Sequence, residues 1–345
     1  MRRIRVLIVD DSPIVRSVLS RILSAEADIE VIGQASDPFD AKKFVIEENP
    51  DVVTLDVEMP RMDGITFLKR LMAYKPVPVV MISSYTHENS MRTLEALEAG
   101  AVDFVPKPVA NLEESLTELK REIVAKVRAA GWAKVRPQVV KRRPDAAMRA
   151  VKAARVSKVL AIGASTGGTQ AIERLLASLN FHVNGILVVQ HMPPRYTASF
   201  AQRLNSLVSF EVVEAQDRDR VEKDRVLIAP GGKHMRVVRD RLGLMVRLDE
   251  SPPVNHQRPA VDVLFASVAE TLGRDSVGIV LTGMGEDGAR GLLAMKESGA
   301  FTLAQDEQTS VVYGMPRVAA EMGAVSQVAP LNEMAEIILA STRTR

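Results

Sequence analysis

Cysteine is absent from this sequence of 345 residues. Its absence excludes disulfides, thiolate metal sites, redox pairs and a cysteine nucleophile. Any nucleophile that this protein uses must therefore be an oxygen or a nitrogen atom.

Long hydrophobic runs are also absent. Apolar runs such as 6–9 and 185–189 last only a few residues, far fewer than the roughly 20 that span a bilayer. The first residues, Met-Arg-Arg-Ile-Arg, reach Asp10 and Asp11 too soon for a secretory signal peptide. We therefore expect a cytoplasmic protein without membrane insertion.

Charge is nearly balanced over the whole chain but is unevenly distributed along it. The net charge is +2, and 46% of the residues are hydrophobic, as in an ordinary globular protein. Residues 1–122 carry 15 basic and 21 acidic side chains, 123–157 carry 10 and 1, and 158–345 carry 20 and 21. This length and the basic middle predict two domains with a connecting segment.

The connecting segment contains two prolines and the triplet Lys141-Arg142-Arg143 but no strand pattern. A charged stretch interrupted by prolines is typical of a solvated linker. Nucleic-acid contact is the alternative, but neither interleaved aromatic residues nor a helix-turn-helix pattern accompanies the charge. We therefore predict domains at 1–122 and 157–345, joined by a basic linker at 123–156.

Both predicted domains alternate short Val- and Ile-rich runs with segments of helical length. This alternation is typical of a parallel sheet covered by helices on both faces, so we predict two doubly wound α/β domains. The predicted strands are 4–9, 29–34, 52–55, 77–82 and 103–105 in the first domain, and 159–162, 186–190, 226–229, 245–248 and 277–282 in the second. The predicted helices are 13–26, 37–48, 63–73, 88–99 and 111–130, then 168–179, 195–207, 260–272, 286–298 and 332–342.

Five polar side chains follow strands of the first domain: Asp10, Asp11, Asp56, Ser83 and Lys107. Because the carboxyl ends of parallel strands meet at one edge of the sheet, we expect them to share a crevice. Clustered carboxylates suit a hard cation such as Mg²⁺, and a lysine offers positive charge to an incoming anion. The pattern predicts a carboxylate that accepts a phosphoryl group, although acidic residues at strand ends can also simply cap helices.

Four motifs carry these residues: Val-Leu-Ile-Val-Asp10-Asp11-Ser-Pro, Thr-Leu-Asp56-Val-Glu-Met-Pro-Arg-Met-Asp-Gly, Met-Ile-Ser83-Ser and Phe104-Val-Pro-Lys107-Pro108. Together they resemble the receiver domain of two-component response regulators, which has a flavodoxin-like fold. The resemblance implies Asp56 as the phosphoacceptor, Mg²⁺ held by Asp10, Asp11 and Asp56, and a switch formed by Ser83, Phe104 and Lys107. It also implies a cis peptide between Lys107 and Pro108.

In the second domain, a serine lies in the turn Gly163-Ala-Ser165-Thr166-Gly167, between a predicted strand and a predicted helix. Such a turn exposes a nucleophile, and the helix N-terminus offers N–H groups to an oxyanion. The alternative is a dinucleotide-binding turn, because a pyrophosphate also binds at a helix N-terminus. The spacing Gly-x-x-x-Gly-Gly argues against that alternative, as does a histidine where a ribose-binding carboxylate is expected.

Two further residues follow strands at the same sheet edge. His191 comes directly after the strand 186–190, and Asp287 comes shortly after the strand 277–282. His191 could act as a general base for Ser165, and Asp287 could orient the imidazole. Either residue could instead be an ordinary solvated or turn residue.

Six stretches extend this pattern over both domains: Ile-Gly-Ala-Ser165-Thr-Gly-Gly, Val-Val-Gln-His191-Met-Pro, Ala-Pro-Gly231-Gly232-Lys-His234, Pro-Ala-Val-Asp262-Val-Leu-Phe, Leu-Thr-Gly-Met284-Gly-Glu-Asp287-Gly-Ala and Ala-Gln-Asp-Glu-Gln-Thr-Ser-Val-Val-Tyr-Gly-Met-Pro. They resemble the chemotaxis methylesterases of the CheB family, which join a receiver to a protein-glutamate methylesterase domain.

The resemblance implies a nucleophile at Ser165, a base at His191, an orienting carboxylate at Asp287, and an oxyanion site near Thr166 and Met284. It implies glutamyl methyl esters of chemotaxis receptors as substrates, deamidation of certain receptor glutamines, and a histidine kinase as phosphodonor. We expect the receiver to inhibit the esterase until Asp56 is phosphorylated. A receiver-controlled transcription factor and a nucleotide-binding output domain are the competing functions.

Overall fold

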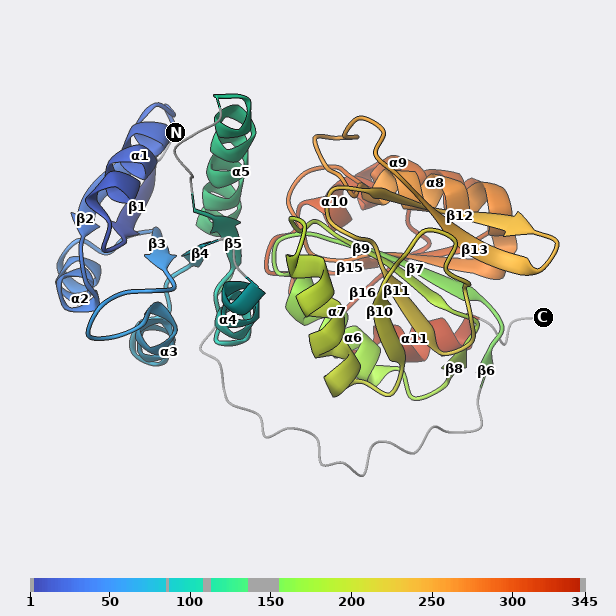
Figure 1. Ribbon diagram of the computed structural model, residues 1–345. Helices are drawn as coiled ribbons and strands as arrows, with labels where there is room; N and C mark the ends of the chain where they lie inside the picture. The colour runs from blue at the N-terminus through green and yellow to red at the C-terminus, as the bar shows by residue number, and fades with distance from the viewer. Residues whose placement is uncertain (1–2, 85–86, 108–112, 136–154, 342–345) are drawn as a thin grey trace. The chain divides into compact units, whose positions relative to one another are not determined.

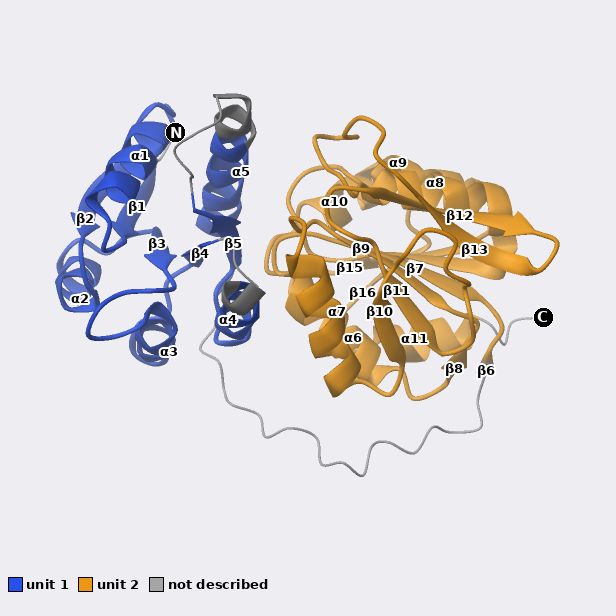
Figure 2. Cartoon of the chain, viewed as in Figure 1, with its two compact units in different colours: residues 1–140 blue, residues 141–345 orange. Residues whose placement is uncertain are grey.

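In the computed structural model, each of the two units of the chain, residues 1–140 and 141–345, is built on its own parallel sheet (Figure 2). The structure describes residues 3–84, 87–107, 113–135 and 155–341. Among the helices of these residues, none has both the length and the apolar character to cross a membrane.

The first unit contains a five-stranded sheet in the order β2-β1-β3-β4-β5, with every strand parallel. Helices α1 and α5 cover one face and α2, α3 and α4 the other (Figure 1), so the central strands β3 and β4 are buried throughout. The five predicted strands are confirmed. The elements are β1 (Ile4–Val9), α1 (Pro13–Ser24), β2 (Ile29–Ala35), α2 (Pro38–Glu47), β3 (Val52–Asp56), α3 (Gly64–Tyr74), β4 (Val79–Ser83), α4 (His87–Glu98), β5 (Asp103–Pro106) and α5 (Glu113–Gly131).

Helix α5 corrects the predicted start of the linker, because it continues past residue 122 to Gly131. Ile123, Val124 and Val127 recur at helical spacing and are buried in the first unit. The basic residues of this stretch are also engaged within the unit. Arg128, for example, donates hydrogen bonds to Asp28 at 2.7 and 2.6 Å. The positive charge at 123–131 therefore belongs to a packed helix of the first unit and not to a linker.

The second unit contains a seven-stranded parallel sheet in the order β10-β11-β9-β7-β14-β15-β16. Helices α8, α9 and α10 cover one face, and α6, α7 and α11 cover the other (Figure 1). The elements are β6 (Arg155–Val156), β7 (Val159–Ala164), α6 (Gly168–Ser178), β8 (His182–Val183), β9 (Ile186–Gln190), α7 (Tyr196–Leu207), β10 (Glu211–Glu214), β11 (Arg225–Ile228), β12 (His234–Asp240), β13 (Gly243–Asp249), α8 (Val261–Leu272), β14 (Ser276–Val280), α9 (Ala289–Glu297), β15 (Phe301–Gln305), α10 (Met315–Glu321), β16 (Gln327–Ala329) and α11 (Met334–Ala340).

The predicted strand at 245–248 lies outside the parallel sheet. It belongs to β13, which pairs antiparallel with β12 to form a separate hairpin. Six strands that the structure describes in the second unit were not predicted: β12, β15, the two edge strands β10 and β16, and the two-residue strands β6 and β8, which pair with each other. The edge strands are short and partly exposed, so they lack the fully apolar runs that identified the central strands.

The order of the second sheet brings three functional loops together. Strand β7 lies between β9 and β14, and all three run parallel. The residues that follow them, Ser165, His191 and the loop that contains Asp287, therefore emerge at one edge of the sheet.

Gly64 gives a test of packing in the first unit. A Cβ at this position would lie 1.9 Å from the carbonyl oxygen of Asp56, a backbone atom that cannot rotate away. We predict that Gly64→Ala lowers the free energy of unfolding of this unit by about 3 kcal/mol. Urea unfolding followed by circular dichroism measures the loss.

Gly131→Ala is the matched control. The atoms nearest to its Cβ would be those of the Ile4 side chain, which can move, and alanine favours the helix. The expected change is below about 1 kcal/mol. Equal losses in both variants would show that the approach of α3 to the end of β3 is not the constraint.

Candidate active site

The first unit brings three carboxylates and one ammonium group together at the ends of β1, β3 and β5. One oxygen from each of Asp10, Asp11 and Asp56 lies within 4.8 Å of the others. Lys107 Nζ is 2.6 Å from Asp56 Oδ2 and 3.4 Å from Asp10 Oδ2. Asp10 and Asp56 are buried, whereas Asp11 is exposed.

The cluster has too little positive charge for its carboxylates. Burial raises the pKa of Asp56 to about 6, and the charge of Asp10 adds to this, although the hydrogen bond from Lys107 opposes it. Burial likewise raises the pKa of Asp10. Within the described residues, Asp10 Oδ2 accepts no hydrogen bond. This set of carboxylate oxygens, in which Asp10 Oδ2 faces Lys107 Nζ at 3.4 Å as an ion pair without a hydrogen bond, fits Mg²⁺.

Two of the three side chains predicted to form the switch, Ser83 and Phe104, are buried in the first unit, and the third, Lys107, is partly exposed. Ser83 Oγ accepts a hydrogen bond of 2.7 Å from Thr93 Oγ1 on α4. Lys126 on α5 donates to the carbonyl oxygen of Phe104 at 2.6 Å, and its Nζ lies 4.7 Å from the centre of the Phe104 ring. The predicted cis peptide before Pro108 lies outside the described residues.

In the second unit, Ser165 occupies the turn between β7 and α6. Its N–H donates to the carbonyl of Thr282 at 3.0 Å. Its carbonyl accepts from Gln190 Nε2 at 2.9 Å. Gly167, with φ of +77°, closes the turn in the left-handed region, where glycine is favoured. These bonds tie the serine backbone to both neighbouring strands.

His191 follows β9 beside Ser165. Ala164 and Gln190, which directly precede Ser165 and His191, lie opposite each other on the paired strands β7 and β9. The N–H of His191 donates to the carbonyl of Ala164 at 3.1 Å. The imidazole is buried, and its Nε2 is 2.7 Å from Asp287 Oδ2. Within the described residues, Nδ1 is buried without a hydrogen-bond partner, and no Ser165 Oγ–His191 bond is formed. Nδ1 is therefore the nitrogen left for proton exchange with the serine.

Asp287 is held by four donors. Oδ2 accepts from His191 and from the N–H of Val261 at 2.7 Å. Oδ1 accepts from the N–H of Asp262 at 3.1 Å and from Asn255 Nδ2 at 3.0 Å. Burial would raise the pKa of Asp287, but the hydrogen bond from His191, its charge and the other donors outweigh burial and lower it. The carboxylate therefore stays ionised.

The two residues predicted near an oxyanion differ in exposure. Thr166 is buried, and its carbonyl accepts from Thr282 Oγ1 at 2.9 Å. Met284 is 37% exposed and follows Gly283. A Cβ on Gly283 would lie 2.7 Å from Ser165 Cβ, so the loop that carries Met284 passes directly against the serine.

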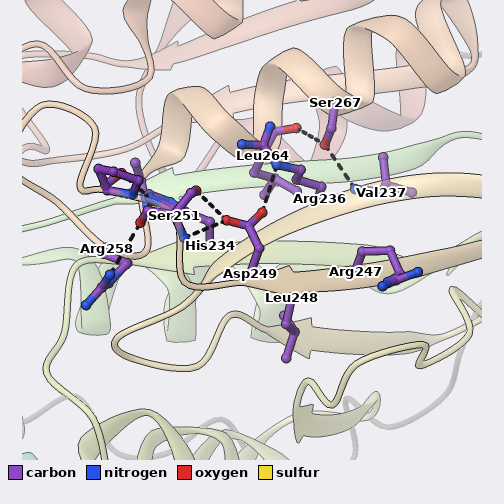
Figure 3. Close-up of polar contacts among 12 residues, drawn as sticks. His234, Arg236, Val237, Arg247, Leu248, Asp249, Ser251, Arg258, Leu264 and Ser267 are labelled. Atoms are coloured by element: carbon purple, nitrogen blue, oxygen red, sulfur yellow. Dashed lines mark hydrogen bonds and ion pairs between the residues drawn. The ribbon is translucent and has the colours of Figure 1, made fainter.

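The segment between β13 and α8 supplies a contact that the sequence analysis missed, that of Asn255 with Asp287. Figure 3 shows how this segment is anchored: Asp249 accepts from Ser251 and, at 2.9 Å, from Arg236, and Arg258 donates to the carbonyls of residues 250 and 251. Buried His234 bonds Pro252 O and the N–H of Ala260, each at 3.2 Å. The strand pattern did not identify Asn255, because the residue follows a strand of the antiparallel hairpin and its contact with Asp287 joins residues 32 apart in the sequence.

These observations define a class: a response regulator whose receiver precedes a three-layer α/β domain with a Ser, His and Asp set at its sheet edge. Residues 6–119 match the response regulator receiver domain, and residues 160–338 match the CheB methylesterase family. The chain belongs to the CheB methylesterase family. The predictions of fold class and of an enzyme of this family are confirmed.

The similarity to relatives extends over the whole chain. The chain is 47% identical to the protein-glutamate methylesterase/protein-glutamine glutaminase of Salmonella typhimurium, and the alignment covers 99% of this chain and 97% of that protein. The chain is 48% identical to the protein-glutamate methylesterase/protein-glutamine glutaminase 1 of Geobacter metallireducens, and the alignment covers 96% of this chain and 94% of that protein. The crystal structure of the Thermotoga maritima CheB methylesterase catalytic domain is 37% identical, with a TM-score of 0.52, and covers 53% of this chain and 98% of that chain.

His234 makes the second unit sensitive to pH. Burial lowers the pKa of His234 below its ordinary value of 6.5, with Arg236 and Arg258 adding to burial and Asp249 opposing it. The unfolded chain therefore binds the proton more readily, so stability is complete above about pH 6.5 and decreases as the pH falls below it. We predict that His234→Gln removes this dependence.

Urea unfolding at pH 7.5 and 5.5, followed by circular dichroism, measures the effect. The expected dependence is at most about 1.4 kcal/mol per pH unit. His256→Asn is the control, because His256 lies in the same segment but is exposed. An unchanged dependence in the His234 variant would contradict the prediction.

Proposed function

We propose that the chain is a phosphorylation-activated serine esterase. It hydrolyses glutamyl methyl esters on the cytoplasmic helices of chemotaxis receptors and deamidates specific receptor glutamines. The names of its relatives in Salmonella typhimurium and Geobacter metallireducens support both activities. The observation that carries the proposal is the buried 2.7 Å bond between His191 and Asp287 at the sheet edge that bears Ser165.

The reaction begins when His191 Nδ1 takes the proton of Ser165 Oγ. Oγ forms a bond to the ester carbon, and the carbonyl oxygen becomes an oxyanion that N–H groups near Thr166 and Met284 stabilise. His191 then gives the proton to the departing methoxide, which leaves as methanol. Water, activated by the same histidine, hydrolyses the acyl-enzyme and restores the serine. A glutamine follows the same path and releases ammonia.

Asp287 holds the imidazole with Nε2–H toward its carboxylate, which keeps Nδ1 unprotonated before the reaction. Its negative charge then stabilises the imidazolium that forms during the attack. The lowered pKa of Asp287 supports this role, since the carboxylate remains charged near neutral pH.

In the receiver, we propose Asp56 as the phosphoacceptor, with Asp10, Asp11 and Asp56 as the residues that hold Mg²⁺. When bound, the metal neutralises charge on the transferred phosphoryl group. Lys107 supplies a further positive charge 2.6 Å from Asp56. Ser83, with Phe104 and Lys107, acts as the switch. The Ser83 hydroxyl accepts from Thr93 at 2.7 Å and would donate its own proton to the phosphoryl group.

The implied partners are the methylated chemotaxis receptors as substrates and the chemotaxis histidine kinase as phosphodonor. Receptor helices that carry the methyl esters lie in the cytoplasm, so the proposal places the reaction there. It requires neither nucleic-acid binding nor membrane insertion.

Ser165→Ala tests the esterase. We predict that this variant releases no methanol from methylated receptor, because the only oxygen that attacks the ester has been removed. Phosphorylation of Asp56 by a small phosphodonor should be unchanged, because Asp56 lies in the other unit, and circular dichroism at the wild-type level is the control for folding. Methanol release at the wild-type rate would show that another residue is the nucleophile.

Asp56→Asn tests the regulation. A phosphodonor should raise methanol release by the wild-type protein but not by this variant, because an amide cannot form the acyl phosphate. Removing residues 1–150 should raise the basal rate if the unphosphorylated receiver inhibits. Equal activation of both full-length proteins would contradict the assignment of Asp56.

A further inference from the structure

One side-chain amide joins two buried or half-buried carboxylates beside the proposed triad. Asn255 Nδ2 donates to Asp287 Oδ1 at 3.0 Å and to Asp262 Oδ2 at 2.8 Å. An amide nitrogen carries two hydrogens, so both are used. Asn255 thus links the orienting carboxylate to a second acidic residue that has no assigned role in the proposed mechanism.

The backbone at Asn255 is built to present this amide. Val254 and Gln257 pair through two backbone hydrogen bonds of 3.1 and 2.8 Å. The two residues between them, Asn255 and His256, have φ values of +50° and +63°. Asparagine is among the few side chains that tolerate this left-handed region. The tight turn therefore fixes the amide against α8 with little freedom to move.

Asp262 is itself fixed. Its Oδ1 accepts from the N–H of Gly291 at 2.7 Å, and its Oδ2 accepts from Asn255. Burial raises the pKa of Asp262, and the charge of Asp287 adds to this effect. Two carboxylates thus lie close enough to repel each other, and the Asn255 amide is the donor that both share.

Loss of the amide would leave Asp287 unevenly held. Oδ2 would keep His191 and the N–H of Val261, but Oδ1 would keep only the N–H of Asp262, at 3.1 Å. The repulsion from Asp262 would then act on Oδ1 without a donor between the two groups. The carboxylate plane would rotate and move Oδ2 away from His191 Nε2.

We propose that Asn255, anchored by Asp262, is a positioning residue that holds the Asp287 carboxylate in plane with its bond to His191. The inference rests on the proposed esterase function. Loss of the Asn255–Asp287 contact should lower kcat and leave KM nearly unchanged, because Asn255 influences the reaction through the position of Asp287 and not through a contact with the receptor.

Asn255→Gly is the decisive variant, since glycine accepts the positive φ and removes only the amide. We expect kcat for methanol release to fall by about 10- to 100-fold with KM within about twofold, as for a misaligned catalytic group. Asn255→Asp should lose more, because a third carboxylate replaces the shared donor. Asp262→Ala should lose less, because Asn255 keeps its bond to Asp287.

Asn184→Ala is the matched control. Its amide donates to Ser157 O at 2.7 Å in the same unit, near the amino end of β9 and so at the opposite sheet edge. It should leave kcat unchanged. A wild-type kcat in Asn255→Gly, or a loss confined to KM, would overturn the proposal.

A second readout does not depend on the substrate. The proton between His191 Nε2 and Asp287 should give a low-field proton NMR signal in the wild type, assigned by its loss in His191→Asn. In folded Asn255→Gly, verified by circular dichroism, this signal should shift or broaden. An unchanged signal in Asn255→Gly would reject the positioning role, whether or not the wild type has esterase activity. A shifted signal in Asn255→Gly together with an inactive wild type would reject only the proposed function.

Discussion

The bond between His191 and Asp287 requires that a carboxylate with a side chain only 3% exposed remain ionised. Burial alone opposes this, because it favours the neutral acid. Donors reverse the effect, and two of them are the first N–H groups of α8, at Val261 and Asp262. Helix geometry leaves these groups without partners inside the helix. The proposed triad therefore depends on α8 beginning beside Asp287.

The first turn of α8 can lie beside Asp287 because two residues that approach Val261 closely, Gly163 and Gly288, have no side chain. A Cβ on Gly163 of β7 would be 2.2 Å from Val261 Cγ1, and one on Gly288 would be 2.6 Å from the same atom. On the other side, His234 ties the N–H of Ala260 to the hairpin strand β12. The close approaches of Gly163 and Gly288 to Val261, and the hydrogen bond from Ala260 to the buried His234 ring, thus hold the N-terminus of α8 in hydrogen-bonding reach of Asp287.

The sequence was sufficient to predict two parallel sheets, their central strands β1, β3, β4, β7, β9 and β14, and the residues that follow those strands. Ser165, His191 and Asp56 could be located because largely apolar, buried strands precede them and parallel strands share one carboxyl edge. Asn255 could not, since its contact with Asp287 spans 32 residues and depends on a turn with positive φ. The end of the first domain was misplaced because charge was weighed above the apolar spacing of Ile123, Val124 and Val127. Edge strands such as β10 carried too few buried residues to be recognised.

The two units place buried carboxylates at sheet edges with opposite electrostatic results. Asp287 has four donors, and its pKa is lowered; Asp56 has chiefly Lys107 and the N–H of Glu58, and its pKa is raised. Burial is common to both, so donors and neighbouring charges together decide the sign: the charge of His191 helps to lower the pKa of Asp287, whereas the charge of Asp10 helps to raise that of Asp56. A carboxylate whose oxygens already accept hydrogen bonds from several donors gains little from a further ligand, and it can hold a neighbouring side chain in place. An under-satisfied one gains when a cation or a phosphoryl group arrives, which is the property that a site for reversible phosphorylation requires.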